Sequence, residues 1–231
     1  MQLDFAKREL TLKLVYYGPS LSGKTTNLQV LYRLVDPSVR GRLTQLDTRD
    51  DRTLFFDLLP VHFTTRSGLT VKIKVFTVPG QVMHNSTRRV LLSGADAIAF
   101  IADSQVSLAG ENEESFRGMI ENLRENGIDP AAIPIVIQFN KRDVADVRSD
   151  EELDELGKRS RERIYKAIAV RGVGVLETFN GLLDALWESL ESHVDIGAKF
   201  GLSRAEFLAG VFRHLNVQQP PTLADTRKGA S

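Results

Sequence analysis

The stretch "YYGPSLSGKTTNLQ", residues 16–29, decides the fold class of this 231-residue chain. The preceding run "LTLKLVYY" (10–17) alternates and is rich in Leu, Val and Tyr, which predicts a β-strand. Residues 25–34 carry apolar side chains at helical spacing and predict a helix that Asp36-Pro37 ends. Between them, residues 18–25 match the pattern G-x-x-x-x-G-K-[ST]. A strand, this loop and a helix in that order predict a P-loop that binds a nucleoside triphosphate.

Each fixed position of this pattern has a physical purpose. Backbone N–H groups surround phosphate oxygens, which needs glycine where the chain comes close to them. We expect the Lys24 ammonium at the β- and γ-phosphates and the Thr25 hydroxyl on Mg²⁺, with the positive end of the helix directed at the anion. The residues assigned to nucleotide binding are Gly18, Ser20, Leu21, Ser22, Gly23, Lys24, Thr25 and Thr26. A chance glycine-rich turn is the alternative, and the flanking strand and helix argue against it.

The rest of the chain alternates strands with helices, which predicts an α/β fold with a mostly parallel six-stranded sheet and helices on both faces. A hairpin over 52–78, turning at Ser67-Gly68, adds one antiparallel edge strand. The other expected strands are 96–103, 133–140 and 164–170, and the other expected helices are 85–93, 111–126, 150–163 and 175–194. Ligands of such sheets bind at the carboxyl ends of the strands, and each motif below follows a strand.

The segment "QFNKRD" (138–143) indicates which base is bound. Asn140, Lys141 and Asp143 match the N-K-x-D motif that reads guanine. A carboxylate at Asp143 can accept hydrogen bonds from N1–H and N2–H₂ of guanine, whereas adenine has an acceptor at N1 and would leave it unpaired, at about 1–3 kcal/mol. We expect Asn140 and the stem of Lys141 to tie this loop to the phosphate loop. The alternative is an ordinary polar turn at a strand end.

The segment "TVPGQ" (77–81) is the candidate hydrolytic part. Gly80 can give a backbone N–H to the γ-phosphate, and Gln81 can orient the attacking water. An aspartate that supports Mg²⁺ is expected at position 77, where Thr77 carries no charge. Either metal affinity is weak or another carboxylate compensates. The candidates are Asp47, Asp50, Asp51 and Asp57.

The segment "DDRTLFFD" (50–57) is where a first switch loop would end. Thr53 can lend its hydroxyl and carbonyl to Mg²⁺ and the γ-phosphate. Arg52 is a candidate arginine finger supplied in cis, with a solvated charge as the equal alternative. After the last strand, a backbone N–H near Ala169 is a candidate contact for guanine O6, although apolar residues there are more often core.

Composition narrows the functional class. The chain is 42% hydrophobic and 26% charged, with 30 basic and 30 acidic residues, so nothing predicts nucleic-acid binding. The absence of cysteine excludes disulfides, thiolate zinc sites and cysteine nucleophiles. The longest apolar run, 97–102, is too short to span a bilayer. We expect a soluble cytoplasmic protein without an integral membrane segment.

The C-terminal part departs from the strand–helix order. We divide the chain into a G domain (1–195), a helical extension (196–215) and a disordered tail (216–231). Residues 196–201 are expected to form a break, and 202–215 a helix opened by a capping box of Ser203 and Glu206. The apolar stripe of that helix has three interpretations: packing on the domain, docking of a partner, or membrane anchoring.

Several segments together resemble the MglA-type small GTPases of bacteria, relatives of the Ras and Arf proteins. They are "VYYGPSLSGKTTNLQ", "DRTLFFDLLP", "TVPGQV", "ADSQ", "VIQFNKRD" and "GVGVLETF", in the family's order over residues 8–192. Ras and Arf proteins would carry an aspartate at position 77, so the resemblance makes Thr77 a family trait. Ser22 and His84-Asn85 depart from the family pattern, and the second departure affects the expected activator surface. The chain beyond residue 195 has no counterpart in the family and suggests a paralogue.

The resemblance implies a Ras-like G domain that hydrolyses GTP with Mg²⁺. Lys24, Arg52 and Gln81 would be the catalytic residues, with Arg52 the intrinsic finger, and Thr25 and Thr53 the metal ligands. The implied partners are a roadblock-fold MglB-type activator that supplies no arginine, and polarity or motility effectors, with recruitment to a cell pole. We expect a monomer outside such complexes. A pseudo-GTPase scaffold that holds nucleotide with little hydrolysis is the alternative, favoured by Thr77 and opposed by Arg52 and Gln81.

Overall fold

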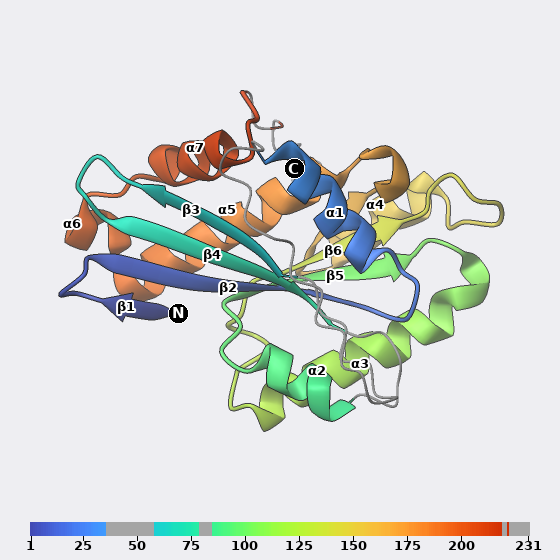
Figure 1. Cartoon of the computed structure of the whole chain (residues 1–231). Helices are drawn as coiled ribbons and strands as arrows, with labels where there is room; N and C mark the ends of the chain where they lie inside the picture. The colour runs from blue at the N-terminus through green and yellow to red at the C-terminus, as the bar shows by residue number, and fades with distance from the viewer. Residues whose placement is uncertain (36–57, 79–84, 219–220, 222–231) are drawn as a thin grey trace, which may run out of the picture.

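The computed structural model describes residues 1–35, 58–78, 85–218 and 221. In this part of the chain a twisted central sheet lies between two layers of helices, which is the expected α/β architecture (Figure 1). Helices α1, α5 and α7 cover one face of the sheet, and α2 and α3 cover the other.

The described residues form a seven-stranded sheet in the order β3-β4-β2-β5-β6-β7, with β1 paired to β2. The strands are β1 (Gln2–Asp4), β2 (Glu9–Tyr17), β3 (Leu58–Thr64), β4 (Thr70–Thr77), β5 (Ala97–Asp103), β6 (Ile135–Asn140) and β7 (Arg163–Lys166). Strands β4, β2, β5, β6 and β7 run parallel, and β3 pairs antiparallel with β4 at the edge, so the predicted hairpin is confirmed. Pro60 lies in the edge strand, where a missing N–H is tolerated.

Strand β1 was not expected, and the prediction of six strands is wrong by this one. It pairs antiparallel with β2 through three residues, from Gln2 opposite Thr11 to Asp4 opposite Glu9. A three-residue strand is too short to show alternation in the sequence. Only its pairing with β2 identifies it.

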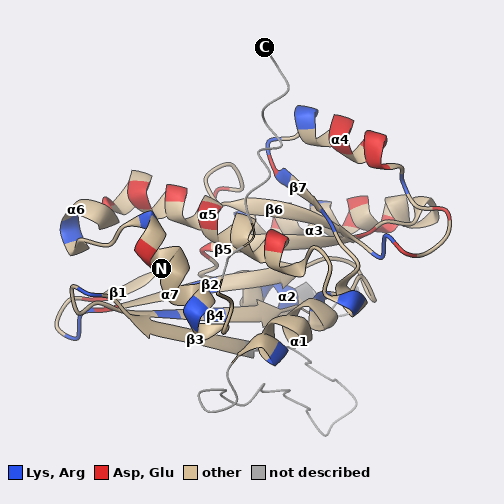
Figure 2. Ribbon diagram, turned by 90° about the horizontal axis from the view of Figure 1, so that it is seen from above, with Lys and Arg blue, Asp and Glu red and all other residues tan. Residues whose placement is uncertain are grey.

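The helices match the expected positions with differences at their ends. They are α1 (Lys24–Leu34), α2 (Asn85–Leu92), α3 (Ala109–Glu125), α4 (Asp150–Arg159), α5 (Val175–Val194), α6 (Ile196–Phe200) and α7 (Arg204–His214). Helix α4 stops at Arg159 because Ser160 is extended, so the prediction of a helix to residue 163 is wrong. Its first turn is acidic and its last turn basic, which suits the helix dipole, and Figure 2 shows both signs along it.

Two further expectations are corrected. Strand β7 ends at Lys166, because residues Ala169–Arg171 form a 3-10 turn (η3) that leads into α5. The expected break at 196–201 contains the short helix α6, between left-handed residues Asp195 and Gly201. Its Ile196 is 1% exposed, so burial of this side chain stabilises a turn that the local sequence does not favour.

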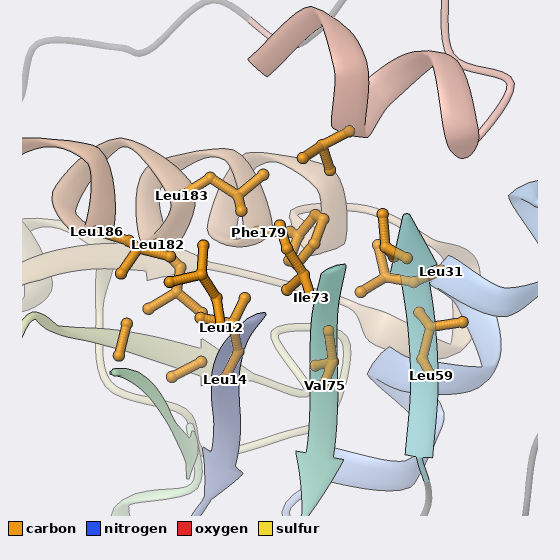
Figure 3. Packing of buried hydrophobic residues seen from close by; sticks show 14 of the residues in the cluster. Leu12, Leu14, Leu31, Leu59, Ile73, Val75, Phe179, Leu182, Leu183 and Leu186 are labelled. Carbon is orange, nitrogen blue, oxygen red and sulfur yellow. The ribbon is translucent and has the colours of Figure 1, made fainter. Parts of the chain in front are cut away.

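The sheet separates two apolar clusters. The larger joins β2, β3 and β4 to α1, α5 and α7, and Figure 3 shows part of it, including Leu12, Ile73 and Phe179. The second lies between the sheet and α2 and α3 and includes Val15 and Tyr17. Successive residues of β2 point to opposite faces of the sheet, and one of the two clusters covers each face. Residues 14–17 at the carboxyl end of β2 are therefore all buried.

Helix α7 packs on the domain. Phe207, Val211 and Phe212 are at most 1% exposed, and the Phe207 ring contacts those of Phe63 in β3 and Trp187 in α5. The predicted capping box is half present: Ser203 Oγ accepts the Glu206 N–H at 3.2 Å. The Glu206 carboxylate instead accepts the N–H of Arg66 at 2.7 Å and links α7 to the β3–β4 turn.

Candidate nucleotide-binding site

The loop between β2 and α1 lies at the carboxyl end of the central strand. Gly18 has φ 148° and Gly23 has φ 98°, a region that L side chains rarely adopt. A Cβ on Gly18 would lie 2.2 Å from the carbonyl oxygen of Ile101, and one on Gly23 would lie 2.1 Å from Nδ2 of Asn140. The two glycines therefore let this loop approach the ends of β5 and β6 closely, in addition to the approach to phosphate that the motif predicts.

Lys24, the first residue of α1, has its ammonium inside the loop. Its Nζ donates to the carbonyl oxygens of Gly18 at 3.1 Å and Pro19 at 2.5 Å. The residue is 7% exposed, and burial, with the nearby charge of Arg88, lowers the pKa of Lys24 to about 8. Among the described residues this buried ammonium is paired with two neutral carbonyls and no anion, so it is suited to binding an anion, which would favour its charged form.

The other loop residues differ in exposure. Ser20, Leu21 and Thr25 are exposed, Thr26 is half-buried, and Ser22 is buried with a hydroxyl that has no hydrogen-bond partner in the described part of the chain. Thr25 lies in the first turn of α1 and is exposed, so its hydroxyl is accessible to a cation. Together with the buried ammonium, these groups fit a magnesium–phosphate ligand.

Asn140, the last residue of β6, joins the base loop to the phosphate loop as expected. Its Nδ2 donates to the carbonyl oxygen of Ser22 at 2.8 Å, and its Oδ1 accepts the N–H of Ala169 at 2.9 Å. Asn140 is 2% exposed, so these bonds are shielded from water. One amide therefore holds three segments together at the carboxyl edge of the sheet. A contact of the Ala169 N–H with guanine would have to share this donor.

Lys141 and Asp143 take different partners. Lys141 has φ 64°, and its ammonium lies 2.6 Å from the carboxylate of Asp103, the buried last residue of β5. Asp143 lies 3.6 Å from the guanidinium of Arg171 in η3. Its side chain is 21% exposed, so the carboxylate remains accessible to a base.

A second polar network beneath the site was not anticipated. Asn27 of α1 and Gln138 of β6 exchange two amide hydrogen bonds, at 2.9 and 3.0 Å, and Gln138 also donates to the Thr178 hydroxyl of α5 at 2.8 Å. Asn27 donates further to the carbonyl oxygen of Gly23 at 2.9 Å. The sequence signal was a glutamine inside an apolar strand. Its partners Asn27 and Thr178 lie 111 and 40 residues away in the chain, so only the fold reveals them.

The predicted hydrolytic residues belong to two segments outside the described ranges. Arg52, Thr53, Gly80 and Gln81 lie outside the described residues, as do the four alternative aspartates. Thr77 ends β4 and is 3% exposed. The residues the structure describes hold no group of three or more His, Asp or Glu side chains arranged to bind a metal ion.

The chain is similar in sequence to a known bacterial protein. It is 41% identical over 180 residues to the mutual gliding-motility protein MglA of Myxococcus xanthus, a match that covers 78% of this chain and 92% of that protein. The chain belongs to the MglA family. No family model matches the chain.

Family membership and the sheet topology agree: the fold is a Ras-like G domain of the MglA type. The match spans 78% of the chain, so part of it lies outside the aligned length. In the described part, no helix combines the length and apolar character needed to cross a bilayer.

Proposed function

We propose that this member of the MglA family is a GTP/GDP switch that hydrolyses GTP and controls cell polarity and motility. The observation that carries the proposal is that Asn140, in the guanine motif, bonds both to Ser22 in the phosphate loop and to Ala169 at the start of η3. It brings the triphosphate and guanine motifs together at the carboxyl ends of β2 and β6, where ligands of α/β sheets bind.

Phosphate binding is assigned to Lys24 and the loop N–H groups. The Lys24 ammonium, held by two carbonyls, is a buried point charge at the start of α1, and the helix dipole adds to its field. The Thr25 hydroxyl would hold Mg²⁺, with Thr53 as second protein ligand. The bound ion would neutralise charge on the β- and γ-phosphates.

Base selection is assigned to Asp143. Its carboxylate accepts from N1–H and N2–H₂ of guanine, while Arg171 at 3.6 Å helps to hold it. Adenine would leave the carboxylate without donors, which disfavours it by about 1–3 kcal/mol.

The hydrolytic step is in-line attack. Water forms a bond to the γ-phosphorus, the bond from that phosphorus to the β–γ bridging oxygen breaks, and GDP and phosphate leave. Gln81 orients the water, Gly80 donates an N–H to the γ-phosphate, and Arg52 and Lys24 neutralise charge in the transition state. These roles are supported by the resemblance of the motifs and by the family.

The same family argument supports the partners. We assign a roadblock-fold MglB-type activator, which brings Arg52 and Gln81 into place, and effectors of polarity or motility. The protein would act as a monomer in the cytoplasm and be recruited to a cell pole. Residues 196–215 would be a helical extension that packs on the G domain through α7.

The second candidate function is a scaffold that holds guanine nucleotide without hydrolysing it. It is favoured by Thr77, which places an uncharged side chain where a magnesium-supporting aspartate is expected in Ras and Arf proteins. Wild-type protein incubated with GTP, alone and with a roadblock-type activator from the same genome, separates the two. Slow phosphate release that the activator accelerates supports the switch, and tight binding without release under both conditions supports the scaffold.

Two variants refine this test. Gln81→Ala and Arg52→Ala are expected to bind GTP as wild type does and to lose activated hydrolysis by about a hundredfold or more. Unchanged activated turnover in Arg52→Ala removes the arginine-finger role.

A further inference from the structure

Arg88 of α2 is a buried cation with no role among the nucleotide-binding residues above. The residue is 6% exposed, and its Nε has no hydrogen-bond partner in the described part of the chain. Its Nη1 donates to the Tyr17 hydroxyl at 3.4 Å, and its guanidinium carbon lies 6.0 Å from the centre of the Tyr17 ring. A long hydrogen bond and a distant ring compensate a buried charge poorly.

Two half-buried cations in the described ranges do have an anionic partner. Arg163 lies 2.7 Å from Asp184, and Lys141 lies 2.6 Å from Asp103. Arg88 pairs with no carboxylate in these ranges. The adjacent Arg89 is exposed and lies 3.1 Å from Glu125, so of two neighbouring arginines in one helix, Arg89 has a carboxylate partner and Arg88 has none among the described residues.

Arg88 lies beside the phosphate loop. Tyr17, which it contacts, directly precedes Gly18. Lys24 is a second buried cation without a carboxylate among the described residues, and the positive charge of Arg88 contributes to the lowered pKa of Lys24. Two uncompensated cations near one loop create a strongly positive field where a polyanion is expected.

We propose that Arg88 is a second cation of the phosphate site, which acts with Lys24 to favour binding of the nucleotide polyphosphate, and of GTP more than GDP. The inference rests on the proposed function. The preference follows from charge, because the triphosphate carries more negative charge than the diphosphate.

The test compares Arg88→Met with Arg88→Lys and with the control Arg89→Met. Methionine keeps much of the length of arginine and removes the charge, lysine keeps the charge, and the control removes an exposed charge from the same helix. Dissociation constants for GDP and for a non-hydrolysable GTP analogue are measured with Mg²⁺ at physiological salt. Chemical unfolding of each nucleotide-free protein is measured in parallel.

Arg88→Met is expected to weaken binding of the GTP analogue at least about tenfold, the size of the Coulomb attraction between unit charges that are set about 10 Å apart at an effective dielectric constant of about 20. The loss for GDP should be smaller, Arg88→Lys should retain most of the affinity, and Arg89→Met should match wild type. The nucleotide-free Arg88→Met protein should be as stable as wild type or more so, because a buried charge without a partner is replaced by an apolar side chain.

Three results would overturn the inference: Arg88→Met affinities within about twofold of wild type, equal losses for the two nucleotides, or equal losses in Arg88→Lys and Arg88→Met. Lower stability of nucleotide-free Arg88→Met with unchanged affinity would make Arg88 a packing residue. Wild-type protein that binds neither nucleotide would refute the proposed function itself. Wild-type binding with an unaffected Arg88→Met variant refutes the role of Arg88 alone.

Discussion

Replacement of Asn140 by Ala tests the connection between the two halves of the nucleotide site. The side chain makes two buried hydrogen bonds, one to the Ser22 carbonyl and one from the Ala169 N–H. Alanine leaves both backbone groups without these partners in a site where Asn140 is 2% exposed. The variant should therefore be less stable and should bind guanine nucleotides more weakly.

The expected loss of stability can be worked from these contacts. An unsatisfied buried polar group costs about 2 kcal/mol, so the two groups cost about 4 kcal/mol together. About 1 kcal/mol of side-chain entropy is no longer lost on folding. The free energy of unfolding should then fall by about 3 kcal/mol. Asn140→Asp should lose at least as much, because its carboxylate still accepts from Ala169 but buries a negative charge against the Ser22 carbonyl oxygen.

Urea unfolding of the nucleotide-free proteins measures this loss. Asn126→Ala is the matched control, since Asn126 Nδ2 makes one exposed hydrogen bond to the Arg89 carbonyl at 2.8 Å. That bond should contribute less than about 1 kcal/mol. Asn140→Ala with the same unfolding free energy as Asn126→Ala would refute the reasoning. It would mean that water replaces the two bonds at no cost.

Three other predictions concern charge, packing and base choice. In nucleotide-free protein the pKa of Lys24 is lowered to about 8, from 10.5 for an ordinary lysine. Between these two pH values the unfolded chain binds more protons than the folded protein, so the free energy of unfolding rises with pH. Lys24→Met should remove about 3 kcal/mol of this rise. The prediction is contradicted if the difference in unfolding free energy between wild type and variant stays constant from about pH 7.5 to 10. Gly210→Ala places a Cβ 2.3 Å from the Phe63 ring and should destabilise the protein by about 1–3 kcal/mol. Thermal unfolding measures this loss, and Phe63→Leu should restore part of it. A higher unfolding temperature in the single variant would contradict this packing. Asp143→Asn should weaken GDP binding at least about tenfold and favour xanthosine diphosphate, because the amide can donate to the 2-carbonyl of xanthine. Competition binding between the two nucleotides measures the preference. An unchanged preference would argue against recognition of the base by Asp143.

The sequence was sufficient for features that depend on neighbouring residues. The strand, loop and helix around Gly18–Thr25 follow from local alternation, glycine positions and helical spacing, and the structure contains all three. The buried strands β5 and β6 follow from short apolar runs, and α5 follows from its amphipathic pattern. Local signals were weaker where an element is short or ends without a breaker, as at β1, β7 and α6.

The tertiary structure alone decided which distant residues meet. Asn140 contacts Ser22 across 118 positions of the chain, Asn27 contacts Gln138 across 111, and Arg88 contacts Tyr17 across 71. These contacts depend on the strand order β3-β4-β2-β5-β6-β7, which places the ends of β2 and β6 at one edge of the sheet. Side-chain hydrogen bonds and burial depend on three-dimensional proximity, and local periodicity carries no information about it. Residue types therefore indicated the chemistry of the site. The packing of the sheet and its helices determined which of these groups are paired, and it left buried Arg88 without a carboxylate partner among the described residues.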